Sequence, residues 1–229
     1  TFQRCFKMKN YFKYFIYLYV FIGYSLSNAG SYDDFIAAVT FDQPETIRKL
    51  LARGFDPNTP DEKGVAGLLL ALKSESPKAA MVLAKHPQTN LNVQNKVGET
   101  PLMLAAINNQ LELAKVLIEN GADVNKPDWT PLHYAATRGH RDMMRLLLDN
   151  DAYIDSESAN GTTPLMLAAY SGTPLAVKLL LEEGADPTLV NHGQATALSL
   201  ALNKDHQQSA FYIRAFIESW YIQNPIKQE

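Results

Sequence analysis

The side chains that could perform chemistry are few in this sequence and widely separated. Besides acidic residues, it offers one cysteine, Cys5, and five histidines. The histidines are His86, His133, His140, His192 and His206. They show no metal-ligand spacing, and no Gly-x-Ser-x-Gly, His-Glu-x-x-His or phosphate-loop motif occurs. We therefore expect no enzyme, no catalytic residue, no metal site and no cofactor.

The distribution of charge disfavours nucleic-acid binding. The formal net charge is −3, from 21 basic and 24 acidic side chains in 229 residues. Residues 1–29 contain four of the basic residues and no acidic one, so residues 30–229 carry a net charge of −7. Basic side chains provide most of the affinity for phosphate backbones, so we expect no nucleic-acid partner.

The N-terminal 29 residues have the pattern of an export signal. A basic stretch around Met8, the expected start, precedes an apolar run of 13 residues from Tyr14 to Leu26. The small residues Ser27 and Ala29 follow, which predicts cleavage after Ala29. The protein is then expected to be periplasmic or secreted. The alternative is an uncleaved membrane anchor in residues 8–26, although a spanning helix needs about 20 apolar residues.

The rest of the chain consists of internal repeats. Residues 99–106 (ETPLMLAA), 129–136 (WTPLHYAA) and 162–169 (TTPLMLAA) align with one another, and weaker copies flank them. The residues that mark the phase of the repeat are spaced by 33, 34, 30, 33 and 33 positions. They are Asp33, Ala66, Thr100, Thr130, Thr163 and Thr196. A period near 33 indicates stacked structural units rather than a single closed core.

Within each unit, the residue types specify a pair of helices. The threonines are suited to cap a helix N-terminus, and the prolines that follow three of them fit the first helical position. A second helix must end twenty-one residues after the phase mark. Four of the units have a residue there that tolerates a left-handed conformation. These are Gly54, Gly121, Asp151 and Gly184.

This pattern resembles the ankyrin repeat over about residues 31–220. The resemblance implies an all-α solenoid of about six helix-turn-helix units with short hairpin fingers, forming one domain over residues 30–229. We place the units at about 31–62, 63–96, 97–126, 127–159, 160–192 and 193–221. Ala66 and Gly67 lack the cap and the proline, so the second unit should be irregular. The finger before Trp129 is three residues short.

The resemblance also implies where a partner would bind. Ankyrin proteins bind through finger tips and the two residues after the Ala-Ala pair, on the concave face, and Arg, Tyr and Trp are enriched in interface hot spots. The predicted partner-binding residues are Ile107, Asn108, Trp129, Arg138, Tyr170 and Ser171. For Trp129 the alternative is packing over its own hairpin. A further row is expected in the core: Leu70, Leu104, Tyr134, Leu167 and Leu200.

The predicted function is a non-catalytic, monomeric protein-interaction module that binds a partner protein through its concave face. Its size, its lack of cysteine after Cys5 and its signal suggest a small exported bacterial ankyrin-repeat protein. Two alternatives remain: a secreted effector that acts on host proteins, and a scaffold held at a membrane by residues 8–26. Membrane contact is expected only if the N-terminal segment is uncleaved.

Overall fold

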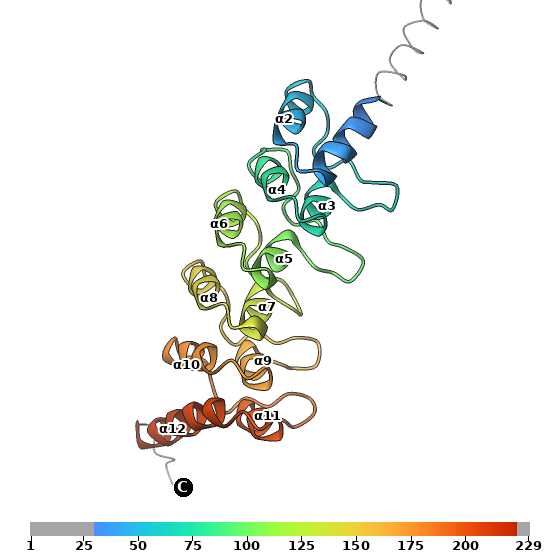
Figure 1. The fold of residues 1–229 in the computed structure, drawn as a ribbon. Coiled ribbons are helices and arrows are strands. Elements are labelled where there is room, and N and C mark those ends of the chain that lie inside the picture. Colours follow the sequence, from blue (N-terminus) through green and yellow to red (C-terminus); the bar gives the residue numbers. More distant parts are fainter. Residues whose placement is uncertain (1–29, 224–229) are drawn as a thin grey trace, which may run out of the picture. The chain divides into compact units, whose positions relative to one another are not determined.

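The computed structural model describes residues 30–223, which form two compact units that divide after Leu83. The predicted signal segment, residues 1–29, lies outside the described residues. In the first unit, residues 30–40 are helical, and α2 (Pro44–Ala52), α3 (Gly67–Lys73) and α4 (Pro77–Ala84) follow (Figure 1).

The irregular start of α3 has a steric cause. Its N-cap is Ala66, whose side chain makes no capping bond. A Cβ atom on Gly67 would lie 2.9 Å from Cζ of the buried Phe35. The helix must therefore begin with glycine here, because the Phe35 ring occupies the space of a proline or any other side chain. The predicted irregularity of this repeat is confirmed.

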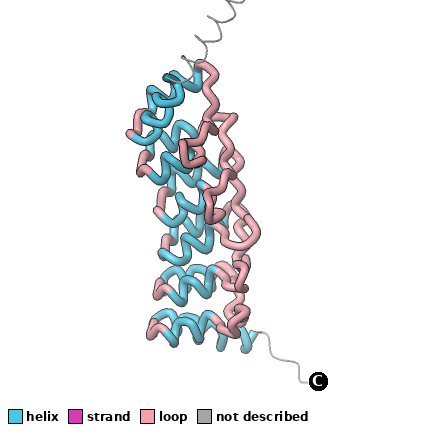
Figure 2. The backbone as a smooth tube through the Cα atoms, turned by 90° about the vertical axis from the view of Figure 1, so that its right-hand side faces the viewer, coloured by secondary structure: helices cyan, strands magenta, loops and turns pink. Residues whose placement is uncertain are grey.

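The second unit, residues 84–223, contains four further helix pairs in two layers. The first helices of the pairs are α5 (Pro101–Ile107), α7 (Pro131–Arg138), α9 (Pro164–Tyr170) and α11 (Ala197–Asn203). The second helices are α6 (Leu111–Glu119), α8 (Arg141–Leu148), α10 (Pro174–Glu182) and α12 (Gln207–Gln223). Loops that we call fingers precede the first helices and run along their side of the unit (Figure 2). Apart from isolated bridges, the described residues contain no strand. The predicted all-α repeat fold is confirmed.

Local capping explains where most of the first helices begin. The hydroxyls of Thr100, Thr163 and Thr196 accept hydrogen bonds from backbone amides three residues later, at 3.1–3.3 Å. These bonds satisfy amides that have no partner within the helix. Thr130 forms a capping box with His133, whose Nδ1 accepts from the Thr130 amide at 3.1 Å and lies 2.9 Å from the Thr130 hydroxyl.

Small residues allow adjacent helices to pack closely. The alanine pair of α7, Ala135 and Ala136, is fully buried, as are the equivalent pairs in α5 and α9. Large apolar side chains such as Leu132, Leu147 and Leu165 fill the space between the layers and are also fully buried. Each repeat therefore buries its apolar surface against its neighbours, as expected of a stacked array.

Neighbouring repeats are joined by a recurring bond after α4, α6 and α8. Asn92 and Asn125 accept a hydrogen bond, each at 2.8 Å, from a backbone amide of the next repeat. Asp155 occupies the equivalent place and accepts from the Asp186 amide at 3.2 Å. Burial raises the pKa of Asp155 above its usual value, the bond from the Asp186 amide opposes this rise, and the negative charge of Asp186 adds to it.

We expect Asp155→Asn to raise the free energy of unfolding by about 0.5 kcal/mol at pH 7, because Asp155 is partly exposed and its charge partly screened. Because the pKa of Asp155 is higher in the folded state than in the unfolded state, wild type loses stability as the pH rises above about 4. The gain should therefore vanish at pH 3, where the carboxyl is protonated in both states. Urea unfolding at pH 7 and at pH 3 measures this gain in the free energy of unfolding. Asn125→Asp is the reverse control, and an equal gain at pH 3 would contradict the electrostatic cause.

Candidate binding surface

The predicted binding residues lie at one end of the first helices of the second unit. Ile107, Arg138 and Tyr170 are the last residues of α5, α7 and α9, and Asn108 and Ser171 follow two of these helices directly. Tyr170 is 46% exposed, Arg138 and Asn108 are exposed, and Ile107 and Ser171 are half-buried. We call the surface formed by α5, α7, α9, α11 and their fingers the inner face.

Tyr170 is held in place by the next repeat. Nζ of Lys204, which caps the end of α11, lies 4.5 Å from the centroid of the Tyr170 ring. The ring nitrogen Nε2 of His206 lies 3.1 Å from the Tyr170 carbonyl oxygen and donates a hydrogen bond to it. A cation over a ring face and a fixed backbone limit the motion of this exposed tyrosine. Lys204 thus lies beside the predicted Tyr170, although it is not among the six predicted residues.

The end of α5 is fixed in the same manner. Nε2 of His140 lies 3.0 Å from the carbonyl oxygen of Ile107. Because a carbonyl oxygen only accepts, the protonated ring nitrogen must be Nε2 in both histidines. The repeat pattern points to Lys204 as well, since it holds the position of Arg138 two repeats later.

Trp129 packs on its own repeat and also contributes to the surface. Its ring centroid lies 5.6 Å from that of His133 and 5.5 Å from that of Tyr134, yet the side chain is 37% exposed. The Tyr134 hydroxyl donates to Glu99 Oε1 at 3.0 Å. Burial, and next the bond to the Glu99 carboxylate, raise the pKa of Tyr134 above its usual value. The structure thus gives Trp129 the packing role that was the alternative prediction, together with partial exposure.

The finger before α7 is shortened, as predicted. The fingers before α5, α9 and α11 are each closed by a backbone bond across the turn, such as Asn95 N–H to Glu99 O at 3.0 Å. The segment before α7 lacks this bond in the described structure, and Asp128 there has a φ of 72°. Its carboxylate accepts from the Ala159 amide at 2.6 Å, which ties the short segment to the next finger.

The row of leucines assigned to the core is only partly buried. Leu104, Leu167 and Leu200, with Tyr134, are half-buried, whereas Leu70 of the first unit is buried. The prediction that this row packs in the core therefore holds only in part in the second unit, where these side chains are half-buried. The row adds apolar area to the inner face.

His133 is structural. It is fully buried, its Nδ1 accepts from the Thr130 amide at 3.1 Å, and its Nε2 donates to the Thr162 carbonyl at 2.9 Å. Burial lowers the pKa of His133 below its usual value, and this effect is larger than the opposing effects of its hydrogen bonds and of the nearby Asp128.

Across residues 30–223, no three His, Cys, Asp or Glu side chains are grouped as metal ligands would be. Within the same residues, no helix has the length and apolar character of a membrane span.

Known proteins share this repeat. The chain is 33% identical over 146 residues to the rat ankyrin repeat and SAM domain-containing protein 6, covering 64% of this chain and 13% of that protein. It is 34% identical over 161 residues to the chicken nuclear factor NF-kappa-B p105 subunit, covering 67% of this chain and 16% of that protein. The chain thus spans a small part of these relatives.

A solved structure and a family model agree with these matches. An ankyrin repeat domain from Acinetobacter baumannii AYE superposes with a TM-score of 0.72 at 24% identity, covering 80% of this chain and 96% of that one, which shows the fold. A model of three ankyrin repeats matches residues 35–128, 126–191 and 150–219. Ankyrin repeats generally mediate protein–protein interactions and are generally non-catalytic. The chain belongs to the ankyrin-repeat family.

Proposed function

We propose that this protein is a non-catalytic module that binds a partner protein through the inner face of residues 84–223. The observation that carries the proposal is the exposed but fixed Tyr170, with Lys204 over its ring and Arg138 at the end of the adjacent first helix. Tyrosine, tryptophan and arginine are the residues that most often dominate binding energy. Half-buried Leu104 and Leu167 add apolar surface beside them.

The frame of this surface is preorganised. The bonds from His140 to Ile107 O and from His206 to Tyr170 O hold the ends of α5 and α9. Surfaces that are already ordered lose less conformational entropy on binding, so more of the contact energy contributes to affinity. A monomer with this surface is sufficient to bind a partner.

We further propose export, to the periplasm or the medium of a bacterium, on the basis of the N-terminal signal pattern. The apolar run from Tyr14 to Leu26 supports a second candidate, a scaffold retained at a membrane. Fractionation of producing cells separates them: a soluble protein shortened after Ala29 supports export, and an intact membrane-bound chain supports the scaffold. The remaining alternative, a secreted effector that acts on host proteins, would be supported by detection of the protein inside host cells.

The binding proposal is tested by a quantitative pull-down from an extract of producing cells. Wild type and a Tyr170→Ala/Arg138→Ala variant serve as baits. We expect a partner that wild type enriches and that binds the variant more weakly by about 2 kcal/mol or more, roughly thirtyfold. Loss of this size follows from removal of two hot-spot side chains at once.

The matched control is Phe211→Ala/Arg214→Ala. Both side chains are exposed and lie on α12, a second helix outside the inner face. This variant should bind like wild type. A partner that loses binding equally to both variants, or to the control alone, would place the site away from the inner face.

A further inference from the structure

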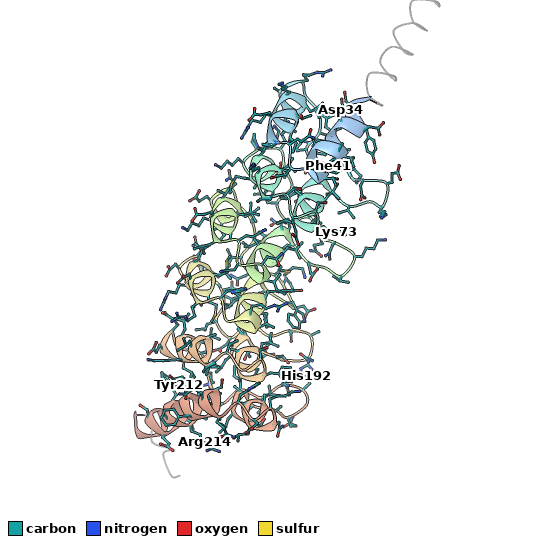
Figure 3. The ribbon with its side chains drawn as sticks, in the orientation of Figure 1. Asp34, Phe41, Lys73, His192, Tyr212 and Arg214 are labelled. Atoms are coloured by element: carbon teal, nitrogen blue, oxygen red, sulfur yellow. The ribbon has the colours of Figure 1, made fainter. Side chains whose placement is uncertain are left out.

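The two neighbouring full-length fingers of the second unit are joined through their backbones. The amide of His192, in the finger before α11 (Figure 3), donates to the Asn160 carbonyl of the finger before α9 at 2.9 Å. These fingers also pack closely, because a Cβ atom on Gly161 would lie 3.1 Å from Cδ2 of His192. One finger therefore covers the tip of the finger before it and satisfies its carbonyl.

The finger before α5 is followed by the short finger before α7 and lacks this cover. Its Val97 stands where Asn160 stands two repeats later, three residues before the threonine that caps the first helix. Within residues 30–223, no hydrogen bond reaches the Val97 carbonyl, and the Val97 side chain is 78% exposed. One carbonyl and one apolar side chain are thus left uncovered beside the short finger.

Trp129, at the end of the short finger, presents a second polar group without a partner. Its indole N–H donates no hydrogen bond within the described part of the chain, and the side chain is 37% exposed. The ring of Tyr134 lies 5.5 Å from that of Trp129, and the Tyr134 hydroxyl donates to Glu99, which closes the finger that carries Val97. Tyr134 therefore connects the two uncovered positions.

The finger that carries Val97 is a fixed turn. Oδ1 of Asn95 accepts from the Val97 and Glu99 amides, each at 3.0 Å, and the Asn95 amide donates to the Glu99 carbonyl at 3.0 Å. The Val97 carbonyl is consequently an acceptor held in a defined position. Unpaired backbone groups beside apolar side chains are a template to which another length of chain can add.

We propose that an extended segment of the partner protein takes the place of the missing finger tip. One backbone amide of the segment donates to the Val97 carbonyl, as the His192 amide does to that of Asn160, and one of its carbonyls accepts from Trp129 Nε1. An apolar side chain of the segment packs on Val97 and Trp129. In this mode of recognition, main-chain bonds provide affinity and side-chain contacts provide specificity. The inference rests on the proposed binding function and specifies part of its partner.

The test begins with a selection of displayed random 12-residue peptides on the full wild-type chain. Enriched peptides are synthesised and titrated against wild type and a filled-finger variant, in which a copy of residues 156–161 replaces residues 126–128 and Trp129 is kept. This variant gives the finger before α7 the length of the finger before α9. Its own finger tip then covers Val97, so we expect it to bind the peptides more weakly by roughly tenfold or more.

Two finer changes test the two hydrogen bonds separately. Trp129→Phe keeps an aromatic ring but removes the indole N–H, and it should weaken binding by about fivefold. N-methylation of each peptide amide in turn removes one donor at a time. At least one position should weaken binding to wild type by roughly tenfold and have no effect on binding to the filled-finger variant. Trp129→Phe and N-methylation keep the finger length, so they decide the question if the filled-finger variant is unstable in urea.

Two matched controls leave the finger before α7 unchanged. A copy of residues 156–161 in place of residues 189–194 changes the sequence of the finger before α11 but not its length. Tyr212→Phe removes a polar hydrogen from an aromatic side chain on α12, on the side away from His192 (Figure 3). Both variants should bind the peptides like wild type.

The outcomes separate this inference from the proposed function. Some peptides could lose binding to the Tyr170→Ala/Arg138→Ala variant and yet bind the filled-finger variant and Trp129→Phe like wild type. That result would overturn the extended segment at Val97 and leave inner-face binding intact. Peptides whose binding is weakened by no N-methylation would overturn the backbone pairing. Failure to enrich any peptide, or binding that no inner-face variant weakens, would count against both proposals.

Discussion

Replacing His133 with alanine is expected to lower the free energy of unfolding by about 3 kcal/mol at pH 7.5. The imidazole satisfies two buried backbone groups, the Thr130 amide and the Thr162 carbonyl, at 3.1 and 2.9 Å. Alanine leaves both without a partner and leaves a cavity in a fully buried site. An unsatisfied buried polar group costs about 1–3 kcal/mol.

His133→Met should cost less, since the equivalent residues Met103 and Met166 fill this position in the neighbouring repeats. Met103 Sδ even accepts from the Thr100 amide at 3.4 Å. The two substitutions therefore separate the volume of the side chain from its hydrogen bonds. Urea unfolding followed by circular dichroism gives both values, and a His133→Met variant as stable as wild type would contradict the role of the Thr162 bond.

The pH dependence of the free energy of unfolding gives a second, independent test of the role of His133. Burial lowers the folded-state pKa of His133 below its usual value near 6.5. As pH falls below 6.5, the unfolded chain gains a proton that the folded chain does not, so stability is lost by up to about 1.4 kcal/mol per pH unit. Between pH 7.5 and 5.5, wild type should lose about 1 kcal/mol more than His133→Met. The other histidines are the same in both proteins, so their contributions cancel in this difference.

Leu147→Ala is the second substitution with a large expected effect, a loss of about 3 kcal/mol. Leu147 lies on α8 between the layers and is fully buried. Removing its side chain loses the transfer free energy of three carbon atoms and leaves a cavity that rigid neighbours fill only in part. In a stacked array the loss should also weaken the interfaces with the flanking repeats.

Leu175→Ala on α10 is the control, because the same atoms are removed from a side chain that is 50% exposed. It should change the free energy of unfolding by less than about 1 kcal/mol. The urea midpoint measures both variants. Similar losses at the two positions would mean that the space around Leu147 is not closely packed.

Local sequence signals determine much of the fold. A threonine followed by proline starts a helix through bonds within one turn, and glycine or Asp151 ends one because few residues adopt a positive φ. The period of 33 then repeats these signals, which determines the helix pairs and their order. For the same reason the ends of the first helices, including Arg138 and Tyr170, could be identified as surface positions.

The tertiary structure alone decided which side chains meet between repeats. Lys204 contacts Tyr170 across 34 positions, and His133 Nε2 donates to the Thr162 carbonyl of the next repeat. Tyr134 and the leucines at its position in the neighbouring repeats are half-buried. Capping and turn signals act over three or four residues, whereas these contacts depend on how far one repeat is displaced from the next. That displacement comes from the packing of buried side chains, so contacts such as that of Lys204 with Tyr170 become visible only in three dimensions.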